Sequence, residues 1–349
     1  MADAAPPAPP PPPPPQQQPV IANQNFAHDV EVDTDSADSG IGSDIRSIES
    51  TSLASSIYGY KYENGRRYHA YRDGAYLMPN DAEEQDRLDL HHHIYRLALN
   101  GALHRAPLGP NFRRVLDFGT GTGIWAIDMA DEYPEAEVVG VDLSPIQPDW
   151  LPTNCKFYVD DIESPWTWSP HEAFDYIHGR GMGGSVASWP ELYTSIYENL
   201  KPGGWVEMQE YEAWISSDDD PELTKAPNTK LWQELVDEAS TKFGKRMNVA
   251  REQKRWIEEA GFEDVREDVV KIPIGHWAKN PKLKEVGRYQ REHMISCVEA
   301  FTLAPLTRIL GWRMEEAQVL MAGVRNEFKD PKLHLLTIFH FVYGRKPLV

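Results

Sequence analysis

A glycine-rich segment that follows an apolar strand pattern constrains the fold of this chain more than any other feature. Residues 114–118 (RVLDF) are typical of a buried strand, and Gly119, Gly121 and Gly123 follow at alternate positions. Glycines at such a turn let the backbone bend sharply and approach a ligand closely, because any Cβ would clash. The next expected strand ends at Asp142, 19 positions beyond Gly123, where a carboxylate can bind both hydroxyls of a ribose. The sequence therefore predicts a site for a nucleotide-like cofactor.

The spacing of the glycines distinguishes between two such cofactors. A dinucleotide site has the pattern G-x-G-x-x-G, so that a pyrophosphate meets a helix N-terminus. Here Ile124 stands where the third dinucleotide glycine would be, and Asp117 closes the strand where its carboxylate would repel a pyrophosphate. A carboxylate at that place suits a cationic sulfonium with a free ammonium group. The pattern favours S-adenosylmethionine, and an NAD-dependent oxidoreductase is the less favoured alternative.

From residue 111 onward, strand and helix patterns alternate along the chain. The expected strands are 114–118, 137–142, 156–160, 174–178, 205–210, 262–274 and 335–343, and the helices expected between them are 122–132, 189–200, 228–243 and 251–261. A further helix is expected just before the first strand, over 87–103. Strands separated by helices predict a parallel sheet with helices on both faces, that is, a doubly wound α/β fold. The pattern of 284–328 is mostly helical, which predicts a helical insertion over about 275–333.

The composition divides the chain into three parts. Residues 1–57 contain a proline run, glutamines and a Ser/Asp/Gly stretch with few large apolar groups, so we expect a disordered tail. Residues 58–110 are expected to form a helical entry segment, and 111–349 the cofactor-binding domain with its insertion.

Charge and cysteine content restrict the cellular setting. The formal net charge of −19 argues against direct nucleic-acid binding, which needs clustered Lys and Arg. Two cysteines without metal-ligand spacing suit a reducing compartment. No signal peptide and no apolar run of membrane-spanning length is evident, so we expect a protein of the nucleus or cytoplasm that is not secreted.

Several of these motifs together resemble those of class I S-adenosylmethionine-dependent methyltransferases. Residues 117–123 are similar to the first motif of that family, 139–142 to the second and 159–162 to the third, and 200–204 (LKPGG) resemble the turn before its fifth strand. The resemblance implies a Rossmann-like sheet of seven strands, in which the seventh strand, 335–343, runs antiparallel.

A narrower resemblance is to the LaeA-like fungal methyltransferases. It is carried by 77–88 (LMPNDAEEQDRL) and by 160–163 (DDIE) followed by Pro165 and Trp166. It implies a nuclear or nucleocytoplasmic regulator of development and secondary metabolism that has velvet-domain proteins as possible partners. The methyl acceptor stays unknown, and a scaffold that recruits transcriptional partners is the alternative.

The candidate site residues follow from these motifs. Asp117, Gly119, Gly121 and Gly123 are expected at the amino-acid end of the cofactor, Asp142 at the ribose, and Asp161 and Ile162 at the adenine. Leu143, next to Asp142, is a further expected cofactor contact. His178 and Arg180 follow the fourth expected strand, beside the transferred methyl group. His178 is the candidate general base, because its pKa suits proton transfer near neutrality, and Arg180 is a candidate cofactor contact.

The entry segment contains two further groups of candidate residues, one of tyrosines with an arginine and one of histidines. Tyr71, Tyr76 and Arg87 are placed to cover the methionine end of the cofactor or to pack the helix of that segment. The consecutive histidines 91–93 point about 100° apart on a helix, so they cannot converge on one ion. No metal site is predicted.

Overall fold

The computed structural model describes residues 59–69, 71, 72, 74 and 76–349. The disordered tail expected over 1–57 lies outside the described residues. Within the described ranges, every helix is too short or too polar to span a lipid bilayer.

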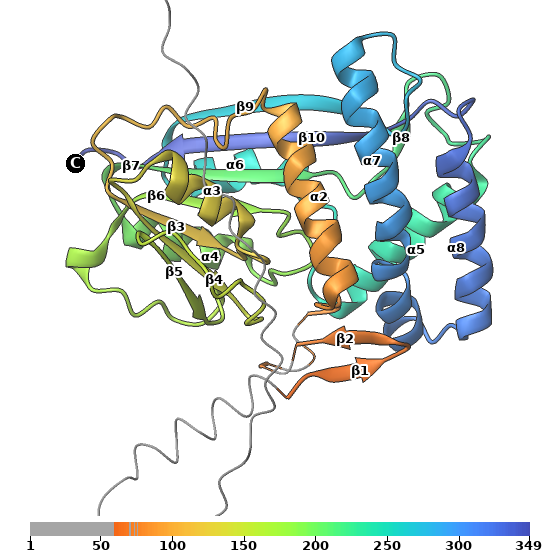
Figure 1. Cartoon of the computed structure of the whole chain (residues 1–349), viewed down its shortest axis with the longest axis horizontal. Coiled ribbons are helices and arrows are strands. Elements are labelled where there is room, and N and C mark those ends of the chain that lie inside the picture. Colours follow the sequence, from red (N-terminus) through yellow and green to blue (C-terminus); the bar gives the residue numbers. More distant parts are fainter. Residues whose placement is uncertain (1–58, 70, 73, 75) are drawn as a thin grey trace, which may run out of the picture. The chain divides into compact units, whose positions relative to one another are not determined.

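A mostly parallel sheet forms the centre of the fold, with its strands in the order β5–β4–β3–β6–β7–β10 and with β9 also paired to β10 (Figure 1). Its strands are β3 (Arg114–Phe118), β4 (Glu137–Asp142), β5 (Cys155–Val159), β6 (Phe174–Arg180), β7 (Leu200–Tyr211), β9 (Glu263–Pro273) and β10 (Leu335–Arg345). The first five run parallel, and β10 is antiparallel to both β7 and β9. This confirms the doubly wound, Rossmann-like α/β sheet with an antiparallel last strand. A two-residue strand that was not expected, β8 (Ser216–Ser217), pairs with the start of β10.

Alternation along the strands supplies both faces of the sheet with apolar side chains. Val115 and Val138 pack with α3 (Ile124–Glu132) on one face. Their neighbours Leu116 and Val139 pack on the other face with α4 (Trp189–Asn199) and α6 (Gln253–Glu259), which follows the short helix η2 (Ala250–Glu252) in the chain. Because successive side chains of a strand point to opposite faces, an apolar strand of this kind needs a helical layer on each side.

The C-terminal part adds a helical cluster beside the sheet (Figure 1). Its members are α5 (Pro227–Phe243), α7 (Pro281–Ala300), a π-helical turn η3 (Pro305–Ile309) and α8 (Met314–Lys329). Trp232 of α5 donates from its indole nitrogen to Thr302 Oγ1 at 2.8 Å, inside a shared apolar core. The stretch 284–328 of the insertion expected over about 275–333 is therefore mostly helical, and α5, which precedes β9, packs with it.

The entry segment differs most from the prediction. It begins with a hairpin of β1 (Lys61–Glu63) and β2 (Arg66–Tyr68), joined by Asn64 and Gly65 with φ of 53° and 80°. Asn-Gly between two strands favours a tight hairpin turn, because both residues tolerate positive φ. This hairpin was not among the expected elements.

Helix α2 (Ala82–Ala98) starts and ends about five residues earlier than the expected 87–103. Asp81 caps it, since its side chain accepts from the Glu84 amide at 3.1 Å. The chain then turns at Asn100 and Gly101, which have positive φ. Leu103, which continued the apolar pattern, is buried outside the helix and accepts a hydrogen bond from Trp125 on its carbonyl.

Candidate functional site

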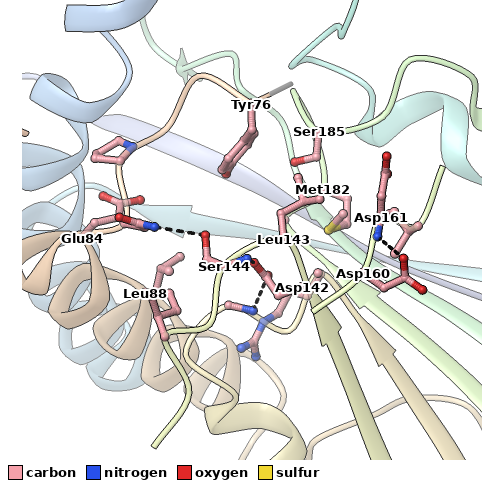
Figure 2. Close-up of a pocket in the computed structure, with 18 of the residues that line it drawn as sticks. Tyr76, Glu84, Leu88, Asp142, Leu143, Ser144, Asp160, Asp161, Met182 and Ser185 are labelled. Carbon is pink, nitrogen blue, oxygen red and sulfur yellow. Dashed lines mark hydrogen bonds between the residues drawn. The ribbon is translucent and has the colours of Figure 1, made fainter. Parts of the chain in front are cut away.

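A cavity lies at the carboxyl ends of β3, β4, β5 and β6, and we call it the edge cavity (Figure 2). Figure 2 shows Tyr76 and Ser185 on one side of it and Asp142 and Asp160 on the other. It is lined by the loop after each of these strands and by the entry segment: Gly119, Gly121, Asp142, Leu143, Ser144, Asp160, Asp161, Ile162, Arg180, Gly181, Met182, Ser185, Tyr76, Pro79, Asn80, Glu84 and Leu88, with Ile146 and Lys245. Seven of the predicted site residues therefore meet in one place.

A second cavity, which we call the adjoining cavity, shares Arg180 and part of the glycine loop (residues 119–123) with the edge cavity. The shared glycines are Gly119 and Gly121. Its other walls come from the entry segment, α2, the end of β7 and the helical cluster: Met78, Arg87, His91, Tyr211, Met247 and Phe301, among others. Tyr76 lines both cavities and Arg87 lines the adjoining one, whereas Tyr71 lines neither. Tyr76 and Arg87 therefore lie at the site, and their contact with the methionine end of the cofactor stays a prediction.

The glycine loop has the close packing that its sequence suggested. Gly119 has a φ of 64°, and a Cβ built there would collide with the thioether of Met182. Gly123 has a φ of 81°, and a Cβ there would enter the ring of Phe157. Gly119 therefore shapes the cavity wall, while Gly123 lines neither cavity and serves the packing of α3 on the sheet.

Asp142 is anchored by the backbone of the two loops beside it. Its Oδ2 accepts from the Gly121 amide and its Oδ1 from the Ser144 amide, both at 2.8 Å. A carboxylate oxygen has two lone pairs, so each oxygen can still accept one hydroxyl. This arrangement suits the paired hydroxyls of a ribose.

Burial raises the pKa of Asp142 to about 6, and the amides of Ser144 and Gly121 act in the opposite direction. Only the ionised carboxylate can accept both hydroxyls. The ligand should therefore bind with full affinity at pH values above this pKa and more weakly as the pH falls through it.

We expect S-adenosylhomocysteine, the product form of the cofactor, to bind roughly tenfold more weakly at pH 5 than at pH 7. Calorimetric titration across that range measures it. An Asp142→Asn protein should show a flat profile, and the same slope in both proteins would contradict the assignment.

The two carboxylates that follow β5, Asp160 and Asp161, accept hydrogen bonds from backbone amides of the turn that contains them. Asp160 Oδ1 accepts from the Asp161 amide at 2.8 Å, and Asp161 Oδ1 accepts from the Glu163 amide at 3.0 Å. Arg72 lies 3.5 Å from Asp161 Oδ2. Both carboxylates line the edge cavity together with Ile162. Asp161 and Ile162 thus lie at the carboxyl end of β5, where they were expected, and their contact with the adenine stays a prediction.

Asp117 and His178 form a buried pair below the cavities. His178 Nδ1 lies 2.7 Å from Asp117 Oδ1, and Thr120 donates to Asp117 Oδ2 at 2.5 Å. The imidazole is fully buried and stacks on Trp125, with ring centroids 3.7 Å apart. Its Nε2 has no hydrogen-bond partner among the described residues.

Asp117 lines the adjoining cavity, whereas His178 lines neither cavity. This geometry does not bring His178 to the place where an acceptor would lose a proton. It orients the Asp117 carboxylate instead, so the general-base role gains no support from the structure.

The three consecutive histidines face three different neighbours. His91 stacks on His293, His92 bonds to Asp128, and His93 meets the edge of Tyr289. Nowhere in the described part of the chain do three or more His, Cys, Asp or Glu residues gather as metal ligands would.

Sequence reasoning missed several residues of the site. Ser144 accepts from Asn80 Nδ2 at 3.2 Å, which ties the entry segment to the loop that follows β4. Met182 fills the space beside Gly119, and Glu84 lines the edge cavity while it holds Arg87 in a buried ion pair of 2.6 Å. The Pro79–Asp81 motif pointed to the entry segment, but no local signal linked Asn80 to Ser144, 64 positions away.

Comparison with known proteins agrees with this geometry. Residues 90–267 match a family model described as a methyltransferase domain. The methyltransferase pytC of Aspergillus terreus is 44% identical over 298 residues, which cover 85% of this chain and 91% of that protein. The secondary metabolism regulator laeA of Aspergillus fumigatus is 40% identical over 306 residues (86% and 81%). The protein-methionine methyltransferase laeA of Emericella nidulans is 36% identical over 289 residues (82% and 76%). This chain therefore belongs to the S-adenosylmethionine-dependent methyltransferases, within the group of LaeA-like fungal relatives.

Proposed function

We propose that this methyltransferase regulates secondary metabolism, and that it does so by transferring a methyl group from S-adenosylmethionine held across the edge cavity. The observation that carries the enzymatic part is Asp142, anchored by two backbone amides beside the glycine loop. The regulatory part rests on the relatives named as regulators, which align with more than four fifths of the chain.

The order of the strands suggests how the cofactor lies. The loops after β5, β4, β3 and β6 follow one another along the edge of the sheet. At about 4.8 Å between strands, these loops span roughly 14 Å, enough for an extended S-adenosylmethionine. Ile162 and Asp161 would then contact the adenine, Asp142 and Leu143 the ribose, and the glycine loop with Asp117 the amino-acid end.

The residues present fit that ligand. The cradle at Gly119 is one that a Cβ would fill, and Asp142 keeps a free lone pair on each oxygen. When bound, the cofactor supplies an already activated methyl group. The chain's own residues have to align the acceptor and exclude water, which supplies most of the acceleration. Tyr76, which lines both cavities, is placed to cover the reacting groups.

The acceptor would approach through the adjoining cavity, whose far wall is formed by Tyr211, Met247 and Phe301. One relative's name states that it methylates protein methionine, and a protein side chain is the acceptor class that we favour here. A nuclear or nucleocytoplasmic location and velvet-domain partners belong to the same proposal and rest on the family resemblance. Copurification of a velvet-domain protein with the tagged full-length chain tests the partner.

A complementation experiment tests the regulatory proposal. We expect a strain that carries Asp142→Ala in place of the wild-type residue to have the secondary-metabolite profile of a deletion strain, because an emptied cofactor site removes methyl transfer. The measurement is mass spectrometry of culture extracts, with equal protein abundance checked by immunoblotting. Asp149→Ala, which changes an exposed carboxylate, should restore the wild-type profile. Full restoration by Asp142→Ala would favour the scaffold alternative.

A further inference from the structure

Arg180 is a cation at the edge of the site without a carboxylate partner of its own. It closes β6 and lines both the edge cavity and the adjoining cavity. Among the residues that the structure describes, no Asp or Glu lies within ion-pair distance of its guanidinium, although Asp89, Asp117 and Asp128 are near enough to favour its charge. A partly buried guanidinium in this position is suited to an anionic group of a ligand.

His92 of α2 accepts a hydrogen bond from this guanidinium. Arg180 donates from one terminal nitrogen to His92 Nδ1 at 3.0 Å. Arginine can only donate, so Nδ1 of His92 must carry the lone pair and Nε2 the hydrogen. Nε2 in turn lies 2.9 Å from Asp128 Oδ2, which accepts that hydrogen. Asp128 therefore selects the tautomer that can hold Arg180.

The neighbouring residues keep the imidazole of His92 neutral and restrict the position of the Arg180 guanidinium. Burial lowers the pKa of His92 to about 4, although the hydrogen bond to Asp128 acts to raise it. Arg96 donates to the same Asp128 oxygen at 3.0 Å and so fixes that carboxylate. The ring of Tyr95 lies 5.0 Å from the Arg180 guanidinium carbon and occupies another side of it. The remaining N–H groups are left for a ligand in the cavities.

We propose that His92 and Asp128 are positioning residues, which aim Arg180 at the carboxylate of the cofactor's methionine portion. This rests on the proposed placement of S-adenosylmethionine. The adenine and ribose would occupy the loops after β5 and β4, so the amino-acid end reaches the loops after β3 and β6. Arg180 is the last residue of β6, directly before the second of these loops. The nearby Asp117 bonds to Thr120 and His178 and makes no ion pair with Arg180 within the described residues. The carboxylate is the anionic group of the cofactor, and Arg180 is a cation at that end that has no carboxylate partner in the described part of the chain.

Two ligands that differ only in this carboxylate test the proposal. We expect the full-length protein to bind S-adenosylmethionine at least tenfold more tightly than decarboxylated S-adenosylmethionine in calorimetric titration. In His92→Leu, affinity for S-adenosylmethionine should fall about tenfold while affinity for the decarboxylated ligand stays unchanged. The ratio of the two affinities would then approach one. His92→Asn offers an amide oxygen near the position of Nδ1 and should restore part of the ratio.

Matched variants of α3 complete the experiment. Asp128→Asn should lower affinity for S-adenosylmethionine alone, by roughly threefold, since it loosens the choice of tautomer. Asp131→Asn changes an exposed carboxylate of the same helix and should leave both affinities unchanged. This pair also decides the question if His92→Leu does not fold.

Two results would overturn the assignment. Equal losses for both ligands in His92→Leu and Asp128→Asn would show a merely structural role, and wild-type affinity for both ligands in these variants would show that Arg180 serves another group. A folded wild-type protein that binds neither ligand would overturn the proposed function itself, and this inference with it.

Discussion

Replacing Glu207 with leucine is expected to lower the free energy of unfolding by about 3–5 kcal/mol. Glu207 lies in the middle of β7 and is fully buried. Its carboxyl group accepts from the amides of Arg105 and Ala106, from the hydroxyl of Tyr176 and from the side-chain amide of Gln209, at 2.7–3.1 Å. Leucine leaves the amides of Arg105 and Ala106 and the hydroxyl of Tyr176 without this acceptor, while Gln209 keeps its hydrogen bond to the Leu103 carbonyl. Each donor that loses its acceptor costs about 1–3 kcal/mol when it cannot reach water.

Thermal or denaturant unfolding of the purified protein measures this effect. For a chain of this size, a loss of that order lowers Tm by roughly 5–8 °C. Glu258→Leu changes an exposed glutamate of α6 and should shift stability by no more than about 0.5 kcal/mol. Glu207 lines neither cavity, so the affinity of the folded variant for S-adenosylhomocysteine should change less than twofold. Near-identical unfolding curves for Glu207→Leu and Glu258→Leu would refute the role given to the buried carboxyl.

Replacing Asp142 with alanine is expected to weaken the binding of S-adenosylhomocysteine by roughly ten- to a hundredfold. The lost interaction is a carboxylate that accepts ribose hydroxyls, which is worth about 1.5–3 kcal/mol. Asp142 also accepts from the Gly121 and Ser144 amides, so its removal loosens the two loops that meet at the ribose position. Calorimetric titration of wild type and variant at pH 7.5 checks the prediction.

The controls for Asp142 separate the ribose contact from general electrostatics. Asp149→Ala removes an exposed negative charge nearby in sequence and should bind the ligand as the wild type does. NAD should bind neither protein, since the glycine spacing and Asp117 do not suit a pyrophosphate. Equal affinity of Asp142→Ala and wild type would remove the ribose assignment, and tight binding of NAD would revive the oxidoreductase alternative.

Local pattern was sufficient for most of the sheet. The bounds of β3 and β4 match the expected strands, because each is an apolar run closed by a carboxylate and a turn. β7 was expected at 205–210 but starts at Leu200, since the strand runs on through the Pro-Gly-Gly turn signal and pairs with the start of β6. The hairpin at Asn64 and Gly65 also follows a local pattern, Asn-Gly between two short strands, although it was not among the expected elements.

By itself, the sequence determined the α/β fold, the glycine loop and the place of Asp142, because each depends on residues that are close together in the chain. Only the tertiary structure decided which side chains meet across long separations. In the folded chain, His178 pairs with Asp117, 61 positions away, and lines neither cavity. The tertiary structure also joined Arg180 to His92, 88 positions away, through the packing of α2 over the end of β6. Such contacts are set by how helices and strands pack in space, and no spacing within the chain encodes them.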